Sequence, residues 1–567
     1  MYRKNWIFKD IDNLLVDKII NKRKISRVAA IVLQNRIEII GDNIENLNKK
    51  LLDRLYDPFL LKDMRRGVDR INSAIENNEK ITVYGDYDAD GVTSTSVLYM
   101  YIKETYDNVD FYIPDRVDEG YGINILALEK IKNNGTKLII TVDTGVTAIA
   151  EVAYAKELGM DVIVTDHHEC KQSVPDCCAI IDPKQSDCDY PFKELAGVGV
   201  VFKLITALDN GKNLDKLIEK YMSLVCLGTI ADVAPLVDEN RVLVILGLKH
   251  FSNSGNAGID ALLDVTLLKG KSVTAGNIGF IIAPRINAAG RLGSANKSVE
   301  LFLCDDRNRA VEIAHELTVE NKTRQTMEQE IFNEAVEIIE SNRLHDNSVI
   351  VVAKNNWHHG VIGIVSSKIT LKYCRPSILI SIEDDSGKGS GRSITNFNLF
   401  EALTYASDTL TKFGGHSLAA GLSINSSNIR QFSLKINEYA NKVLKPDDFI
   451  PSLYIDYKLA PEDINISTVE SLKLLEPFGM GNPTPVFAFC STRVKFMSTI
   501  SDGKHLKLVL TKDGISLEVI GFDYGYLIKE LKIGDKVDVA GTLDINNFRD
   551  EKKVQLIIKD IRKTKTK

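Results

Sequence analysis

Three short β-branched runs between residues 80 and 168 each end in a cluster of acidic or imidazole side chains. ITVY leads into GDYDADG, LIITV into DTG, and DVIVT into DHH. Segments with helical spacing of apolar residues separate the runs, and strands that alternate with helices form parallel sheets covered on both faces. Because the carboxyl ends of such strands meet at one edge, where open α/β sheets bind ligands, we predict an α/β domain with its site at that edge.

Changes in pattern along the rest of the chain predict further units. Residues 1–50 suggest an N-terminal helical extension, and residues 51–340 the α/β domain, with one long helix from about residue 296 to 342 leading out of it. A second, smaller α/β pattern covers residues 341–446. Residues 447–567 contain alternating strands broken by Asp-Gly and Asn-Asn turns, which predicts a C-terminal β-barrel of the OB type.

Composition excludes several classes of protein. The chain has 567 residues, of which 44% are hydrophobic and 26% charged, as is typical of a globular protein. We expect a cytoplasmic protein, because there is neither a signal-peptide core nor an apolar run of about 20 residues that could span a membrane. The eight cysteines lack the paired spacing of a structural zinc site. With a net charge of −6, any surface that binds nucleic acid must be local.

Carboxylates dominate the polar clusters. Asp86, Asp88 and Asp90 stand at alternate positions after the first run. They resemble the start of a calcium loop, but an EF-hand requires Glu where this chain has Val97. Carboxylates gathered at the end of an apolar sheet repel one another, and a bound divalent cation removes that repulsion.

Asp143, Asp232 and the DHH cluster extend this candidate set. An Asp at the end of a strand or helix is as often a cap as a ligand, which leaves both roles open for Asp143 and Asp232. In the DHH cluster, His167 can bind a metal while Asp166 and His168 orient it.

This donor set favours two Mn²⁺ or Mg²⁺ ions over zinc, because oxygen ligands dominate and no thiolate takes part. Two ions about 3.5–4 Å apart can generate hydroxide and bind both the attacking and the leaving oxygen of a phosphoryl group. The residues therefore predict metal-assisted phosphoester hydrolysis. The candidate metal ligands are Asp86, Asp88, Asp90, Asp143, His167 and Asp232.

These motifs resemble a known family. GDYDADGVTST, TVDTG, TDHHE and GTIADVAPL, in this order, are similar to the four motifs of the DHH phosphoesterases. YIPDRVDEGYGIN and PRINAAGRLGSA resemble the RecJ exonucleases within that superfamily, and WHHGVIGIVSSKI, GSGRSI and KFGGHSLAAGLSI resemble their DHH-associated domain. LLEPFGMGNPTPVF is similar to the segment before their OB-fold. The similarity runs from about residue 55 to near the C-terminus.

The resemblance implies an exonuclease that degrades single-stranded DNA 5′→3′ to mononucleotides in recombination and repair. It also implies a monomer that needs no membrane, with single-strand-binding protein and a RecQ-type helicase as candidate partners. Asp86 would be a ligand or lie beside the ligands, and His168 would touch the scissile phosphate or support the site. A carboxylate or a metal-bound hydroxide would supply the nucleophile. The direct ligands would be Asp88, Asp90, Asp143, His167 and Asp232.

Five residues are candidates for holding a terminal phosphate, which arginines, small hydroxyls and glycine-flanked amides bind well. By resemblance, Arg116, Ser390 and Arg392 match the pocket for the 5′ phosphate. Arg285 and Arg291 in PRINAAGR are further candidates, with an ordinary surface ion pair as the alternative for each arginine.

Other residues are candidates for strand contact. His416 lies among glycines that allow a ligand strand to approach, although a packed turn is the alternative. Tyr121 and Trp357 could stack on bases or belong to the core. Lys504 and Lys507, on one strand of the expected barrel, suggest an electrostatic track for DNA.

Two other functions remain open at this stage. One is a DHH phosphoesterase that acts on short oligonucleotides, cyclic dinucleotides or pyrophosphate, which the OB-like tail disfavours. The other is a catalytically inactive relative that serves as a replication scaffold, which the intact ligand set disfavours.

Overall fold

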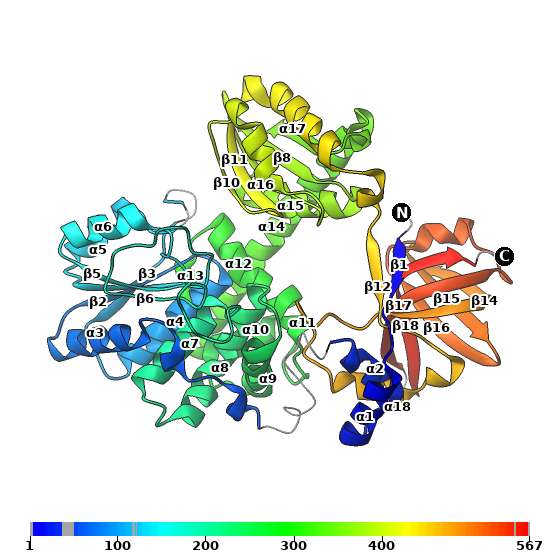
Figure 1. Ribbon diagram of the computed structural model, residues 1–567, viewed down its shortest axis with the longest axis horizontal. Coiled ribbons are helices and arrows are strands. Elements are labelled where there is room, and N and C mark those ends of the chain that lie inside the picture. The colour runs from blue at the N-terminus through cyan, green and yellow to red at the C-terminus, as the bar shows by residue number, and fades with distance from the viewer. Residues whose placement is uncertain (1–3, 37–49, 116–118, 121, 549–550, 565–567) are drawn as a thin grey trace.

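The computed structural model describes residues 4–36, 50–115, 119–120, 122–548 and 551–564. Figure 1 shows three bodies: an α/β domain on the left, a smaller domain above it, and a barrel on the right. The long helix α14 (Arg307–Ser341) connects the first two. No helix among the described residues is long and apolar enough to cross a membrane.

The first domain is built on a parallel sheet with the strand order β3-β2-β4-β5-β6. Helices pack on both faces, so each central strand is buried, as the apolar runs predict. The strands are β2 (Ile81–Gly85), β3 (Val109–Tyr112), β4 (Leu138–Val142), β5 (Asp161–Thr165) and β6 (Ala179–Ile181). The covering helices are α4 (Ala89–Lys103) and α7 (Gly197–Leu208) on one face, and α5 (Ile125–Asn133) and α6 (Ile149–Glu157) on the other.

A helical layer follows the sheet and extends the core beneath α4 and α7. It includes α8 (Leu214–Ala231), α9 (Asp238–Phe251), α10 (Ala257–Val265), a π-helical turn (Ile278–Ile282) and α12 (Ala283–Leu292). The prediction of a single helix from residue 296 to 342 is wrong in one respect. Two helices cover this range, because α13 (Asn296–Leu303) ends before α14 begins. The Asp306 carboxylate accepts hydrogen bonds from the first amides of α14, and this cap starts a new helix.

The second domain contains a mixed sheet with the order β10-β11-β9-β8-β7, in which only β7 and β8 run parallel. Helix α15 (His359–Tyr373) packs against this sheet and against α14. The strands are β7 (Ile350–Asn355), β8 (Ser377–Glu383), β9 (Ser386–Arg392), β10 (Lys412–Gly415) and β11 (Ala419–Asn425).

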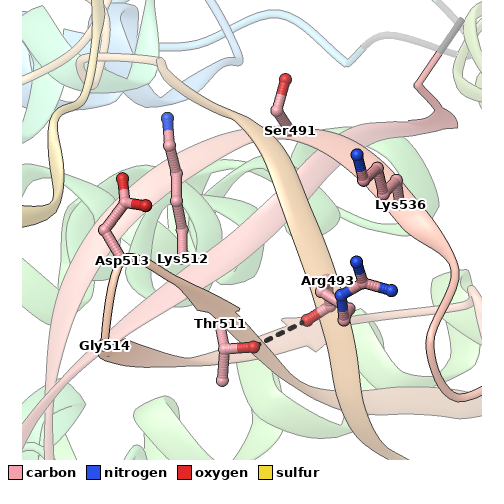
Figure 2. Close-up of a pocket in the computed structure, with 7 residues that line it drawn as sticks. All are labelled: Ser491, Arg493, Thr511, Lys512, Asp513, Gly514 and Lys536. Atoms are coloured by element: carbon pink, nitrogen blue, oxygen red, sulfur yellow. Dashed lines mark hydrogen bonds between the residues drawn. The ribbon is translucent and has the colours of Figure 1, made fainter. Parts of the chain in front are cut away.

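The C-terminal strands close into a barrel, because β14 pairs with β15 through its second half and with β17 through its first. A surface pocket lies where these three strands meet (Figure 2). The strands are β14 (Phe487–Ile500), β15 (His505–Lys512), β16 (Ile515–Gly521), β17 (Lys536–Phe548) and β18 (Glu551–Lys563). The fold class predicted from the sequence is confirmed in all three parts.

The N-terminal segment belongs to the barrel unit. Strand β1 (Asn5–Phe8) pairs in parallel with β12 (Ser452–Ile455), and the Trp6 indole donates to Asp560 at 2.6 Å. Helices α1 (Asn13–Arg23) and α2 (Arg27–Gln34) bury their apolar faces in the barrel core. The two ends of the chain therefore stabilise one structural unit.

Arg241 of α9 links this barrel unit to the first domain. Its buried guanidinium donates to the carbonyls of Leu475, Glu476 and Pro477, which follow helix α18 (Ile466–Lys473). A cation at a helix C-terminus is favourable because the last carbonyls have no partner within the helix.

Candidate metal centre and nucleic-acid contacts

The predicted polar clusters lie at the ends of three adjacent strands. Asp86 follows β2, Asp143 follows β4, and His167 follows β5, and these strands are neighbours in the sheet. The strand order reverses between β2 and β4, which is where open parallel sheets bind ligands. Asp232, at the C-terminal end of α8, also reaches this edge.

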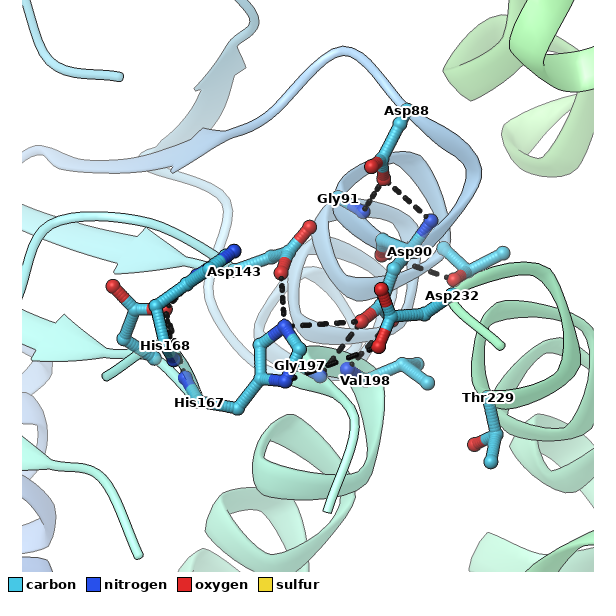
Figure 3. Close-up of polar contacts among 12 residues, drawn as sticks. Asp88, Asp90, Gly91, Asp143, His167, His168, Gly197, Val198, Thr229 and Asp232 are labelled. Carbon is cyan, nitrogen blue, oxygen red and sulfur yellow. Dashed lines mark hydrogen bonds and ion pairs between the residues drawn. The ribbon is translucent and has the colours of Figure 1, made fainter. Parts of the chain in front are cut away.

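Three overlapping groups of side chains could each hold a metal ion, and within each group the ligand atoms lie within 4.8 Å of one another. Asp143 and His167 each belong to two groups, so the groups are parts of one cluster. Figure 3 shows Asp90, Asp143 and His167 pointing toward one another. The groups are Asp143–His167–His168, Asp90–His167–Asp232 and Asp86–Asp88–Asp143.

His167 offers the clearest test of whether this cluster fits a metal. Its Nε2 atom is buried, makes no hydrogen bond, and lies 3.0 Å from Asp143 Oδ1 and 3.8 Å from Asp90 Oδ2. Burial, together with the charge of His168, lowers the pKa of His167 to about 3, so the ring is neutral. A neutral imidazole nitrogen beside carboxylate oxygens is the donor set that a divalent cation requires.

Asp90 is held by the start of α7. Its two oxygens accept hydrogen bonds from the amides of Gly197 at 2.7 Å and Val198 at 2.9 Å. Asp88 caps α4 by accepting from the Asp90 and Gly91 amides. These backbone contacts fix the direction of the carboxylates before any metal binds.

Crowding makes the ionised carboxylates unfavourable without a cation. Burial, followed by the charges of Asp90, Asp88 and other carboxylates, raises the pKa of Asp143 well above its ordinary value. Burial and the charge of Asp88 raise the pKa of Asp232 to about 7. Bound divalent cations reverse this effect, so the residues present fit the metal site that their sequence predicts.

His168 supplies a positive charge beside the cluster. Its Nδ1 atom lies 2.7 Å from Asp166, whose carboxylate also accepts from the amides of Val146 and His167. Burial alone would lower the pKa of His168, but the hydrogen bond and the charge of Asp166 raise it to about 9. The imidazolium is therefore suited to contact a phosphate.

Helix α12 supports the carboxylate loop, which the sequence reasoning missed. The Asn287 side chain accepts from the Ala89 amide at 2.8 Å. A Cβ on Gly290 would lie 2.3 Å from the Tyr87 carbonyl, so only glycine permits this approach. Asn287 and Gly290 both belong to the PRINAAGR motif, so this motif is the sequence signal that could have indicated a contact between α12 and the carboxylate loop.

Ser390 and Arg392 lie together on β9, and the Arg392 guanidinium donates to Ser390 Oγ at 3.2 Å. Gly363 of α15 packs directly behind them, since a Cβ there would meet Ser390 Oγ at 2.9 Å. Two other candidates lie outside the described residues: Arg116, which was matched to the 5′-phosphate pocket, and Tyr121, which was a candidate for stacking on bases.

The two PRINAAGR arginines have partners within the protein. Arg291 donates to the Gly360 carbonyl at 3.0 Å, which links the first domain to the start of α15. Arg285 donates to Thr318 at 3.1 Å and to the Ile281 carbonyl. These contacts give both arginines a structural role in addition to any contact with phosphate.

The remaining candidates differ in exposure. His416 is exposed in the turn between β10 and β11, whereas Trp357 is only 4% exposed and donates to Glu334, as a core residue does. The Lys504 Nζ atom lies 3.5 Å from Asp523 Oδ1, and the Lys507 Nζ atom lies 3.2 Å from Glu518 Oε2. Each predicted barrel lysine therefore faces a carboxylate.

Comparison with known proteins agrees with this architecture. Family models match the DHH family N-terminal domain at residues 80–229, the DHHA1 domain at 346–442 and the RecJ OB domain at 455–560. The chain is 35% identical over 528 residues to the single-stranded-DNA-specific exonuclease RecJ of Salmonella typhimurium, covering 88% of this chain and 90% of the relative. The chain belongs to the RecJ family.

Other members of the RecJ family are similar over most of the chain. RecJ of Bacillus subtilis is 43% identical over 511 residues, which cover 89% of this chain and 64% of the relative. The chain thus spans about two thirds of that relative. The solved structure of Thermus thermophilus RecJ in complex with Mn²⁺ superposes with a TM-score of 0.84 at 30% identity, covering 99% of this chain and 80% of that one.

Proposed function

We propose that the protein is a metal-dependent exonuclease that degrades single-stranded DNA from the 5′ end to mononucleotides. The cluster of carboxylates and His167 at the ends of β2, β4 and β5 carries the proposal. Relatives of this chain are named single-stranded-DNA-specific exonucleases, and the solved structure of Thermus thermophilus RecJ contains Mn²⁺.

The proposed cofactors are two Mn²⁺ or Mg²⁺ ions, which would supply a water nucleophile at neutral pH and neutralise charge on the phosphoryl oxygens. The amides at the start of α7 orient Asp90, and Asp166 holds His168 in its charged form. His168 would then bind a nonbridging oxygen of the scissile phosphate. The proposed metal ligands are Asp86, Asp88, Asp90, Asp143, His167 and Asp232.

We propose that polarity arises because the second domain binds the end of the strand. Ser390 and Arg392 form a compact donor pair that suits a terminal phosphate, and Arg116 is the third proposed member. A terminal phosphate held there fixes which phosphodiester bond reaches the metals. The exposed His416 would contact the strand from the same domain.

The finer biological setting is also a proposal. A single-strand-specific enzyme requires an opened duplex, so single-strand-binding protein and a RecQ-type helicase are the partners we propose, in recombination and repair. We propose that the enzyme works as a monomer in the cytoplasm, where its eight free cysteines stay reduced.

Digestion of end-labelled DNA tests the proposed function. With Mn²⁺ and a 5′-phosphorylated single strand, we expect the 5′ label to appear at once as a mononucleotide, while a 3′ label shortens progressively. A matched duplex should resist cleavage. Release of nucleotides only from oligomers of a few residues would favour a short-oligonucleotide phosphoesterase, and no release at all would favour an inactive scaffold.

A further inference from the structure

A fourth strand end brings a lysine to the metal-binding edge of the sheet. Strand β6 pairs in parallel with β5, which leads into His167 and His168. The loop that follows β6, Asp182–Gln185, therefore reaches the same edge of the sheet as the metal cluster. This loop has one cationic side chain, Lys184, which has no role in the site described above.

Buried polar contacts hold the loop that carries Lys184. The Asp182 side chain is completely buried, and its Oδ1 atom accepts from the Lys184 amide at 2.7 Å. The Gln185 side chain is also buried and donates to the Ile180 carbonyl at 2.7 Å. Because both neighbours are anchored, the backbone of Lys184 is fixed, and its side chain leaves the loop from a defined place.

The Lys184 ammonium lies between two segments that carry or orient the metal ligands. Its Nζ atom is 3.3 Å from Glu169 Oε1 and 3.9 Å from Glu194 Oε2. Glu169 directly follows His168, and Glu194 lies three residues before α7, whose first amides hold Asp90. Both distances exceed the roughly 2.7–2.9 Å of a strong charge-assisted hydrogen bond, although the Lys184 side chain is only 18% exposed. An ammonium with two such loosely held partners can exchange them for a phosphate oxygen.

The charge of Lys184 acts on the metal cluster itself. Burial, followed by the charge of His168, lowers the pKa of His167, and the charge of Lys184 adds to this decrease. Burial and then the charge of Asp88 raise the pKa of Asp232, while the charges of His168 and Lys184 oppose the rise. The same two cations therefore act on both His167 and Asp232, which places Lys184 beside the cluster together with His168.

We propose that Lys184 is a second catalytic cation, which binds the scissile phosphate beside His168 and stabilises the negative charge on its nonbridging oxygens. This inference rests on the proposed function. Water attacks the phosphorus, the bond to the 3′ oxygen of the terminal nucleotide breaks, and that oxygen takes up a proton, while Lys184 stays protonated throughout. A positioned cation of this kind favours the transition state most, because its attraction grows as the charge develops and its position needs no rearrangement.

The first test measures binding without cleavage. A short 5′-phosphorylated oligothymidine is titrated with Ca²⁺ in place of Mn²⁺, and the bound strand is recovered to verify that it is intact. A neutral methylphosphonate at the first linkage should weaken binding by the wild type about tenfold more than binding by Lys184→Gln, because only the wild type loses a charged hydrogen bond. At the third linkage it should weaken binding equally in both. Lys156→Gln is the matched control and should follow the wild type, because Lys156 pairs with Asp176 at the opposite edge of the same sheet.

The second test separates contact with phosphate from a structural bridge between the two glutamates. Lys184→Gln should lower kcat/KM about 100-fold without lowering the Tm or weakening Mn²⁺ binding, and Lys184→Arg should restore part of the loss. Glu169→Gln/Glu194→Gln should keep or raise kcat/KM, because it removes the carboxylates that compete with phosphate for the ammonium. If Lys184 only joined the two segments, removing both glutamates would be as harmful as removing the lysine.

An equal effect of the first-linkage methylphosphonate on the wild type and on Lys184→Gln would overturn the proposal. A difference confined to the third linkage would also overturn it, because Lys184 would then contact the strand away from the scissile bond. A lower Tm or weaker Mn²⁺ binding in Lys184→Gln would assign the lysine a structural role instead. If the wild type cuts no DNA with Mn²⁺, the proposed function fails, while the binding comparison in Ca²⁺ still decides whether Lys184 contacts the first linkage.

Discussion

Replacing Asp232 with asparagine tests whether repulsion within the carboxylate cluster destabilises the metal-free protein. Burial and the charge of Asp88 raise the pKa of Asp232 to about 7 from an ordinary value of 3.8. A carboxyl group with a higher pKa in the folded state binds more protons there, so its contribution to stability is present in full below about pH 4. That contribution is lost as the pH rises through about 7.

The size of this effect follows from the pKa shift. Three pKa units correspond to about 4 kcal/mol at about 1.4 kcal/mol per unit. Because the Asp232 side chain is 29% exposed, solvent screening reduces the expected effect to about 2 kcal/mol. For a domain of this size, about 2 kcal/mol corresponds to a change of roughly 4–8 °C in the melting temperature.

The assay is thermal unfolding in EDTA at pH 4 and pH 8, which brackets the whole pKa shift. We expect the Tm of the wild type to fall between these two pH values, and the Tm of Asp232→Asn to fall by about 4–8 °C less. Mn²⁺ at pH 8 should raise the Tm of the wild type more than that of the variant. Asp189→Asn, at an exposed position, is the matched control and should follow the wild type. An identical pH dependence in all three proteins would refute the reasoning.

Four further substitutions test separate parts of the account. Asp143→Asn should reduce nuclease activity at least 100-fold and abolish Mn²⁺-induced stabilisation, whereas retained activity would remove Asp143 from the ligand set. Arg392→Ala should reduce the preference for a 5′-phosphate over a 5′-hydroxyl about tenfold in competition assays, without changing Mn²⁺ affinity. Gly290→Ala should lower kcat in a protein that still folds, because its Cβ would lie 2.3 Å from the Tyr87 carbonyl; an unchanged kcat would show that α12 can shift. Arg241→Ala should weaken docking of the barrel unit by about 3 kcal/mol and speed limited proteolysis near residue 475, because three carbonyls lose a charged donor.

The location of the candidate site could be predicted because it depends on local pattern. Asp86, Asp143 and His167 each follow a β-branched run, and parallel strands bring such positions to one edge. The role of Asp232 could not be decided from the sequence, since an aspartate at a helix end suits a cap as well as a ligand. Only the packing of α8 against α4 and α7 brings the Asp232 carboxylate into the cluster.

Other features depend on contacts between distant parts of the chain. The pairing of β1 with β12 joins segments almost 450 residues apart, and no local signal in the N-terminal residues indicates it. The pocket at Arg493 depends on the register of β14 with two strands at once. Alternation predicts a strand at this position, but the irregular register that brings two like charges together is a property of the closed barrel.

Counting bound manganese is the most direct test of the central claim, that one cluster of carboxylates and an imidazole holds two catalytic cations. Electron paramagnetic resonance titration of metal-free protein should give two Mn²⁺ per chain with signs of spin coupling between neighbouring ions. Asp143→Asn should bind one ion at most, because Asp143 belongs to two of the three ligand groups. A wild-type protein that binds a single uncoupled ion, or a variant that binds as many as the wild type, would contradict the account.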